Sequence, residues 1–235
     1  MRRFAWSACV TAALALSGCG LISSDVTNFD LTLPDKTFTV DTASWGLGNV
    51  DAFTSTSCSA NAGVCAAAAQ QACNQGQCFG SCDSATQTCD LKVLVSLWQP
   101  VDLVAEKPEL QTINNQPLVG VTIDKLEYQV IENSMNVATP PMTMYIAPAT
   151  VMAPGDPQAH AIATIPAVPA GTTQALMAIE LTADGKTQLA KFMGDYATPF
   201  NIIVGAELDV KQGDTVPAGR LAAKVVVTAH ASLGG

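Results

Sequence analysis

The chain has 235 residues with 11 basic and 20 acidic side chains, and its formal net charge is −9 at neutral pH. Such acidity argues against partners that are themselves negatively charged, namely nucleic acid and anionic lipid surfaces. Hydrophobic residues make up 49% of the chain and charged residues only 13%, which supports a sizeable core. This composition is typical of an extracytoplasmic, β-rich domain.

The first eighteen residues have the pattern of an export signal. Arg2 and Arg3 place positive charge at the start, and a mostly apolar run of thirteen residues follows, from Phe4 to Leu16. That run is too short to cross a bilayer core of roughly 30 Å, which needs about 20 apolar residues. No later segment is apolar for long enough either, so we expect no transmembrane helix. The two arginines leave twin-arginine export open as an alternative route.

Leu16-Ser17-Gly18-Cys19 closes this signal. The motif resembles the lipobox of bacterial lipoproteins, in which two small residues precede a cysteine that is modified with lipid. The resemblance implies cleavage between Gly18 and Cys19 and a diacylglyceryl group on the Cys19 thiol. It also implies a location in the cell envelope. Gly20 favours the outer membrane, since an aspartate at that position favours retention in the inner membrane. The alternative is an ordinary secretory signal that happens to end near a cysteine.

The resemblance makes the membrane the first expected partner, through the lipid alone. One acyl chain binds a membrane marginally and two or more bind it stably, so the protein needs no membrane-binding surface of its own. No cofactor is expected apart from this covalent lipid.

Six further cysteines fall within one window of 32 residues. An even number of cysteines in an exported chain predicts disulfides, here three, and fifteen pairings remain open. The C-x-x-C pairs of zinc knuckles and redox sites and the C-x-x-C-H motif of haem attachment are missing, so no metal site is expected. The six cysteines are Cys58, Cys65, Cys73, Cys78, Cys82 and Cys89.

The window also predicts a short helix. Its alanine- and glutamine-rich run extends from Gly63 to Cys73, with Asn61 as a candidate N-cap. Cys65 and Cys73 would lie broadly on one face of this helix. Both are therefore expected to pair with cysteines of the glycine-rich coil that follows.

Outside the window the chain predicts a mainly β fold, an antiparallel β-sandwich that is immunoglobulin-like in general architecture. Alternating residues at Asp30–Leu33 and Lys36–Asp41 predict two strands around a tight turn at Pro34-Asp35. The alternation shifts by one residue between Ile123 and Leu126, which predicts a β-bulge near Asp124. Further strands are expected at 91–98, 119–132, 142–147, 160–165, 175–181, 200–210 and 221–231.

One short helix near 183–193 interrupts these strands, because Leu189, Phe192 and Met193 fall on a single helical face. It is expected to end at Gly194 and to close an open edge or end of the sandwich. The predicted organisation is a cleaved signal at 1–18, a lipid-anchored linker at 19–24, and a single sandwich domain at 25–233. The cysteine-rich insertion occupies about 50–90.

Candidate catalytic residues are scarce. His160 and His230 stand near strand ends and are interpreted as structural, and no nucleophile or phosphate-loop motif is present. Trp45, Trp98 and Tyr128 would form either a sugar-stacking surface or part of the core. Paired carboxylates of a hydrolase leave no local signature and stay open, as does calcium at the aspartates that neighbour glycines.

The sequence therefore predicts no catalytic, cofactor-binding or metal-binding residues. The resulting hypothesis is a non-enzymatic envelope lipoprotein that binds or scaffolds other envelope components. Its partner would be an envelope protein or a glycan, and nucleic acid is excluded by charge. Two alternatives are an accessory ligand-binding or transport lipoprotein, which would need a buried pocket, and an envelope hydrolase.

Overall fold

Alternating apolar residues build two antiparallel sheets of five strands each. In β10 every second residue from Leu221 to Ala231 is buried, and in β4 every second residue from Cys89 to Val95 is buried. The computed structural model describes residues 28–73, 77–113 and 118–233. The first sheet runs β1–β10–β5–β8, with β2 also paired to β10, and the second runs β3–β4–β9–β6–β7. The strands of the first sheet are β1 (Asn28–Asp30), β2 (Lys36–Asp41), β10 (Arg220–Leu233), β5 (Leu118–Asn133) and β8 (Gln174–Ala178).

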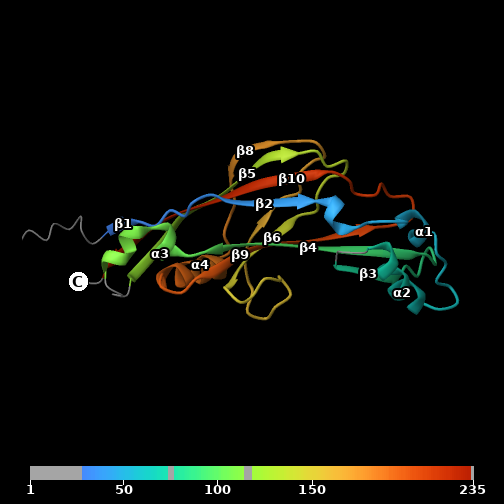
Figure 1. Ribbon diagram of the computed structural model, residues 1–235, viewed down its shortest axis with the longest axis horizontal. Coiled ribbons are helices and arrows are strands. Elements are labelled where there is room, and N and C mark those ends of the chain that lie inside the picture. Colours follow the sequence, from blue (N-terminus) through green and yellow to red (C-terminus); the bar gives the residue numbers. More distant parts are fainter. Residues whose placement is uncertain (1–27, 74–76, 114–117, 234–235) are drawn as a thin grey trace, which may run out of the picture.

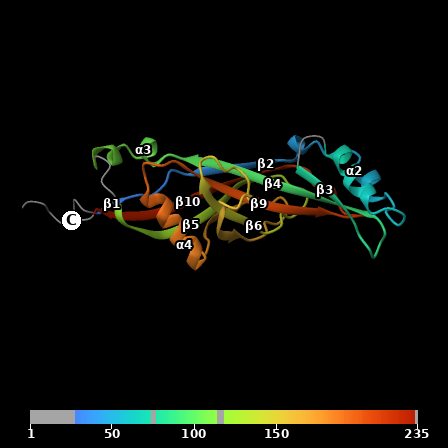
Figure 2. The same ribbon diagram turned by 90° about the horizontal axis from the view of Figure 1, so that it is seen from below.

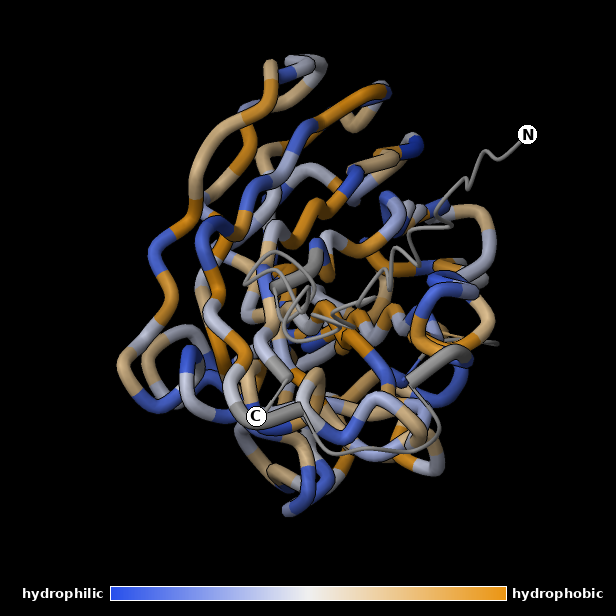
Figure 3. The backbone as a smooth tube through the Cα atoms, turned by 90° about the vertical axis from the view of Figure 1, so that its left-hand side faces the viewer, coloured by the Kyte–Doolittle hydropathy of each residue, from blue (hydrophilic) through white to orange (hydrophobic). Residues whose placement is uncertain are grey.

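The second sheet contains β3 (Gln77–Cys82), β4 (Cys89–Val101), β9 (Phe200–Val210), β6 (Met142–Pro148) and β7 (His160–Ile165). The two sheets face each other across one large hydrophobic cluster, with Tyr128 of the first sheet and Phe200 of the second among its fully buried side chains. In Figure 3, which looks along the long axis, hydrophobic segments gather near the centre of the molecule. The predicted antiparallel sandwich is confirmed.

The predicted bulge in β5 is present. Lys125 pairs with Thr228 and Ile123 pairs with Ala229, so Asp124 is the extra residue that the β10 ladder skips. The shift turns Ile123 and Leu126 to the same buried side although they are three residues apart.

The predicted hairpin at the start of the chain is wrong. Strands β1 and β2 do not pair with each other, because both lie antiparallel to β10, one after the other along the same edge. Asn28 of β1 faces Ser232 and Asp41 of β2 faces Arg220. Strand β10, with 14 residues, is therefore long enough to pair with both strands. Pro34-Asp35 lies in the extended connection between them rather than in a reversing turn.

The insertion contains more regular structure than the sequence predicts. The predicted helix is present as α2 (Gly63–Ala72), and the Asn61 side chain accepts a hydrogen bond from the Gly63 N–H, although Ala62 is the capping residue. A 3₁₀ turn η2 (Thr42–Trp45) and helix α1 (Val50–Thr54) precede it. The segment expected as glycine-rich coil instead forms β3, an edge strand paired with β4.

The predicted helix near 183–193 is α4 (Ala183–Gly194), whose Thr182 hydroxyl accepts a hydrogen bond from the Gly185 N–H. It packs against β5 of the first sheet and β7 of the second. The segment before it crosses between the sheets, since Ile179 donates to Leu126 O and Leu181 bridges to Ala163. Helix α4 therefore closes one side of the sandwich. Two further turns, α3 (Leu103–Glu106) and η3 (Pro108–Ile113), lie in the β4–β5 connection and were not expected.

The long strands make the molecule elongated. Strand β5 has 16 residues, which corresponds to about 50 Å. Strand β1 and the end of β10 lie together at one end, hereafter the terminal end, whereas α1, α2 and β3 form the opposite, cysteine-rich end (Figures 1 and 2). Within the described ranges, no helix has the length and apolar character that a membrane crossing requires.

Candidate functional site

The predicted lipidation and cleavage positions, Cys19 and Gly18, lie outside the described residues. The six cysteines predicted to form disulfides are paired with one another, which confirms three disulfides. Cys65 and Cys73 each bond a later cysteine, as their helical spacing predicts. The three bonds are Cys58–Cys82, Cys65–Cys89 and Cys73–Cys78.

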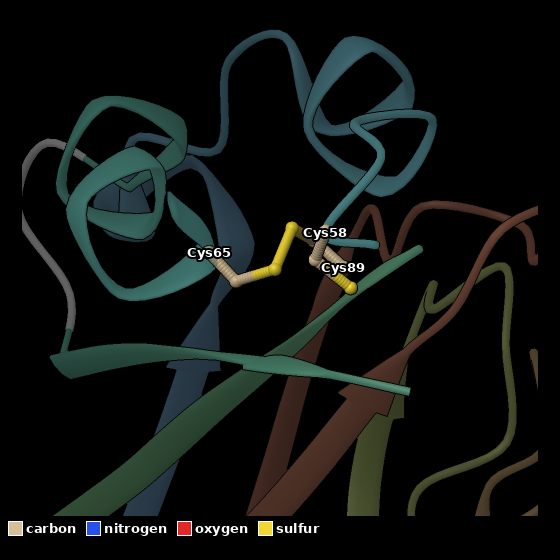
Figure 4. Close-up of side chains that lie close together, drawn as sticks. All are labelled: Cys58, Cys65 and Cys89. Atoms are coloured by element: carbon tan, nitrogen blue, oxygen red, sulfur yellow. A yellow bond between two sulfur atoms is a disulfide. The ribbon is translucent and has the colours of Figure 1, made fainter. Parts of the chain in front are cut away.

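Two of these disulfides lie in contact with each other. The Sγ atoms of Cys58, Cys65 and Cys89 all fall within 4.8 Å of one another (Figure 4). The Cys58 end of the Cys58–Cys82 bond therefore lies beside the Cys65–Cys89 bond. Cys58, Cys65 and Cys89 are buried, and Cys82 is half-buried. They form the centre of a small second core with Phe53, Leu91 and other apolar residues.

The two histidines are far apart in role and position. The His230 Nδ1 atom lies 2.9 Å from a carboxylate oxygen of Asp124, and both side chains are exposed. His160 is half-buried at the start of β7, with its ring centroid 6.5 Å from that of Phe192 on α4. Because the two histidines belong to different sheets, they do not converge on a shared site.

The three aromatic residues proposed as a sugar-stacking surface do not gather. Tyr128 is buried in the main core, where burial raises the pKa of its phenol and its hydroxyl donates to Gln174 Oε1 at 2.8 Å. Trp45 packs against the core of the cysteine-rich end. Only Trp98 is exposed, at 41%. Two of the three therefore serve packing.

Trp98 belongs to a surface that sequence reasoning missed, the outer face of the second sheet. Phe79 of β3 faces Lys92 of β4, and Lys92 and Trp98 are six residues apart on a strand without register shifts. Phe79 and Trp98 therefore point to the same side, away from the first sheet. Phe79 is 57% exposed and Met152, on a loop over the same face, is 47% exposed. Contiguous exposed apolar patches mark interaction surfaces. Ile131, Leu176 and Met177 are exposed to a similar degree on the first sheet.

The β6–β7 loop, residues 149–159, lies on this outer face and is fixed to it (Figure 1). The buried Asn201 amide donates to the carbonyl oxygens of Ala149 and Val151 at 3.1 and 2.8 Å. Pro154 approaches Gly205 so closely that a Cβ on Gly205 would lie 2.9 Å from the proline ring. The missing side chain at Gly205 thus allows the loop to rest on the sheet.

Two open hollows flank this loop. One, of about 630 Å³, extends over Leu94, Ser96 and Tyr145 on the outer face. The other, of about 480 Å³, lies toward α4 and includes His160, Lys191 and Phe192. A smaller apolar cavity of about 30 Å³ lies near Met135 and Leu221, between the two sheets. A ligand of ordinary size would not fit in this cavity.

Charge on the outer face increases toward the cysteine-rich end. Lys92 forms ion pairs with Glu207 and Asp209, and the hydrogen bond that Lys92 donates to Glu207 raises the pKa of Lys92. Asp90 lies 3.8 Å from Lys211, yet burial raises the pKa of its carboxyl. Hydrogen bonds from the Ala85 and Thr86 N–H groups lower the pKa of Asp83. The face therefore combines exposed aromatic groups with mixed, mostly acidic charge.

A comparison with protein-family models found no match, and a search of curated proteins found no significantly similar sequence. Function therefore has to be inferred from the residues of this chain.

Proposed function

We propose that the protein is a lipid-anchored, non-enzymatic component of the cell envelope that binds a partner through the outer face of its second sheet. The anchor rests on the resemblance of Leu16 to Cys19 to a lipobox. The observation that carries the binding role is the joint presence of Phe79, Trp98 and Met152 beside the 630 Å³ hollow on one face.

The position of the terminal end supports this arrangement. Asn28, the start of β1, is nine positions after Cys19, and this stretch spans at most about 30 Å. Because β1 lies at the terminal end, the cysteine-rich end is directed away from the membrane in this proposal (Figure 1). The outer face then extends along the side of the molecule, from near the membrane to its far end.

The small interior space favours surface binding over the alternative of a buried ligand. A ligand pocket ordinarily has roughly 300–1,000 Å³. The apolar cavity near Met135 and Leu221 has about 30 Å³, and the hollows of about 480, 630 and 260 Å³ are open to the surface. The partner that fits an exposed aromatic face is another envelope macromolecule, a protein or a glycan.

The anchor is tested by membrane fractionation and intact mass. We expect the chain to remain with membranes after a high-salt wash and to carry the mass of a diacylglyceryl group on Cys19. A Cys19→Ala variant should lack the mass of the diacylglyceryl group, and the chains whose signal is cleaved elsewhere should be found in the soluble envelope fraction. Wild-type protein that is released by salt and has an unmodified Cys19 would refute the anchor.

The binding face is tested by photo-crosslinking in cells. A photoreactive residue in place of Trp98 or Phe79 should give one specific adduct, and Trp98→Ala should reduce the yield of the Phe79 adduct at least fivefold. The matched control is the same photoreactive residue at Thr122, an exposed position of the first sheet. Equal adducts from Thr122 and Trp98 would refute the assignment of the face.

A further inference from the structure

We propose that the cysteine-rich end, when its disulfides are reduced, binds one Zn²⁺ ion through the thiolates of Cys58, Cys65, Cys82 and Cys89. This site is independent of the partner-binding face. It is also a departure from the sequence pattern, because the local C-x-x-C spacing of zinc knuckles is missing and the ligands meet only in space.

The sulfur positions carry the proposal. Three of the four Sγ atoms lie within 4.8 Å of one another (Figure 4), and the fourth, on Cys82, is bonded to Cys58 but lies outside this group. A tetrahedral Zn²⁺ site has Zn–S distances of about 2.3 Å, which places its sulfur atoms about 3.8 Å apart. After reduction, the bonded sulfurs have to separate and the Cys82 sulfur has to move toward Cys65 and Cys89. Rotation about the cysteine side-chain bonds moves the sulfur atoms in this way.

The backbone around these cysteines is held by more than the disulfides. The Cys58 N–H donates to Gln87 O at 2.9 Å, and the Cys89 N–H donates to Thr56 O at 3.2 Å. Cys82 and Cys89 face each other in the β3–β4 ladder. Backbone contacts that do not depend on the disulfides therefore position three of the four cysteines.

Helix α2 holds the remaining ligand by close packing. Gly80 of β3 lies so near the helix that a Cβ at this position would be 2.0 Å from the Cys65 carbonyl oxygen. Cys65 and Cys89 are fully buried, and Cys82 is half-buried, so the site is shielded on most sides and reachable from the Cys82 side. Shielding from water strengthens thiolate–metal bonds, and the half-buried cysteine provides the route for the ion and for a reductant.

The chemistry makes disulfide and metal mutually exclusive. A phosphine donates two electrons to each disulfide and becomes the phosphine oxide with oxygen from water, and each disulfide yields two thiols. Binding of Zn²⁺ to four cysteines then releases up to four protons, so the affinity of the site rises with pH. A disulfide oxidant such as oxidised glutathione takes two electrons from each cysteine pair and becomes two thiols, which restores the protein disulfides and expels the ion.

The test uses Co²⁺ as the spectroscopic probe and Zn²⁺ as its competitor. The full chain carries Cys9→Ser and Cys19→Ser, so that only the six cysteines of the insertion remain, and it is reduced with a phosphine without oxygen. We expect one Co²⁺ per chain, with the intense visible absorption of tetrahedral thiolate coordination, and loss of this absorption when Zn²⁺ is added. The oxidised chain should give no such spectrum.

The third disulfide provides the matched control. The control adds Cys73→Ser and Cys78→Ser, which removes one cysteine pair. The sulfurs of Cys73 and Cys78 do not belong to the group of Sγ atoms within 4.8 Å of one another. This variant should bind Co²⁺ as tightly as the parent chain. Adding Cys65→Ser and Cys89→Ser should abolish the thiolate spectrum and weaken binding at least 100-fold. Adding Cys82→Ser alone should weaken it at least tenfold and change the spectrum to that of three thiolates.

Thermal melting of the reduced chains distinguishes ligand loss from failure to fold. Zn²⁺ should raise the Tm of the reduced parent chain and of the Cys73→Ser/Cys78→Ser variant, because an ion that binds only the folded state stabilises it. It should not raise the Tm of the Cys65→Ser/Cys89→Ser variant. The proposal is overturned if the reduced parent chain shows no thiolate spectrum. It is overturned equally if the two double variants bind Co²⁺ alike.

Discussion

Cys82 and Cys89 lie directly opposite each other in the β3–β4 ladder, but they are not bonded to each other. Each instead bonds an earlier cysteine, and both bonds close loops of 24 residues. Together with Cys73–Cys78, three bonds therefore join the β3–β4 hairpin to the segment containing α1 and α2. A Cys82–Cys89 bond would instead have closed the hairpin on itself.

The two kinds of disulfide should differ in their effect on stability. Removing Cys65–Cys89 with a double alanine substitution opens a loop of 24 residues and is expected to cost about 3 kcal/mol in the chain-entropy model. Removing Cys73–Cys78, which are five residues apart, should cost about 2 kcal/mol or less. Chemical denaturation of both variants under oxidising conditions measures the difference. Equal losses would contradict the assigned pairing.

Gly80 should tolerate no side chain. The Cβ of Gly80→Ala would lie 2.0 Å from the Cys65 carbonyl oxygen and 3.0 Å from the Phe53 ring, so α2 has to move away from β3. Overpacking of this kind costs about 1–3 kcal/mol, and the rigid backbone contact places this case at the upper end. The matched control is Gly155→Ala, whose Cβ meets no atom within 4 Å. Thermal melting should separate the two variants by several degrees, and a Gly80→Ala protein as stable as Gly155→Ala would be inconsistent with the packing of α2.

Asn201 should control the order of the β6–β7 loop. Asn201→Ala removes the two hydrogen bonds to Ala149 O and Val151 O and leaves both carbonyls without that donor. Each lost buried hydrogen bond costs about 1–3 kcal/mol. We expect faster amide exchange across residues 149–159, measured by mass spectrometry, and little change in the strands of the first sheet. Gln158→Ala, an exposed position in the same loop, should leave the exchange pattern unchanged.

Asp90 should make the cysteine-rich end respond to pH. Burial raises the pKa of Asp90, so the folded chain holds this proton more tightly than the unfolded chain does. Ionised Asp90 therefore destabilises the fold at neutral pH. This destabilisation decreases as the pH falls through the raised pKa of the folded chain, and it is absent well below the ordinary pKa of 3.8. Asp90→Asn is expected to raise the Tm by about 1–2 °C at pH 7 and by nothing at pH 3.

The control for Asp90 is Glu180→Gln, which removes one negative charge from an exposed position. It should change the Tm at pH 7 less than Asp90→Asn does. A lower Tm for Asp90→Asn at pH 7 would indicate that the attraction between Asp90 and Lys211 outweighs the burial of the carboxyl.

Strands with a buried face were predictable from the sequence because one residue in two is apolar. The expected bounds of β7 and β9 agree with the structure, and the one-residue shift at Asp124 located the bulge. Strand β3 was missed since Gln77–Cys82 is polar and glycine-containing and exposes alternate residues to solvent. Its order comes from pairing with β4 and from the disulfides, and neither is a local property.

The sequence did not allow us to predict which strands pair or which distant side chains become neighbours. The two segments at the start of the chain alternate as a hairpin would, but the choice between pairing with each other and pairing with β10 depends on a strand nearly 200 residues later. Trp98 and Phe79 are recognisable as aromatic residues in the sequence, yet only the register of β3, β4 and β9 brings them to one outer face. The signal for that face was the alternation of β4, whose outward positions Asp90, Lys92 and Ser96 are polar and are followed in the same register by Trp98.

Strands β1 and β2 pair one after the other along the same edge of β10, and this has a mechanical consequence if the protein is anchored as proposed above. The chain enters at the terminal end and reaches the cysteine-rich end through these two strands, which run lengthwise along the molecule (Figure 1). A force between the two ends acts parallel to these strands and shears the hydrogen bonds that join β1 and β2 to β10. These hydrogen bonds share the load and do not open one after another. At the far end the tension passes into covalent bonds between sulfur atoms. The fold is therefore suited to transmit force over its full length without unravelling from either end.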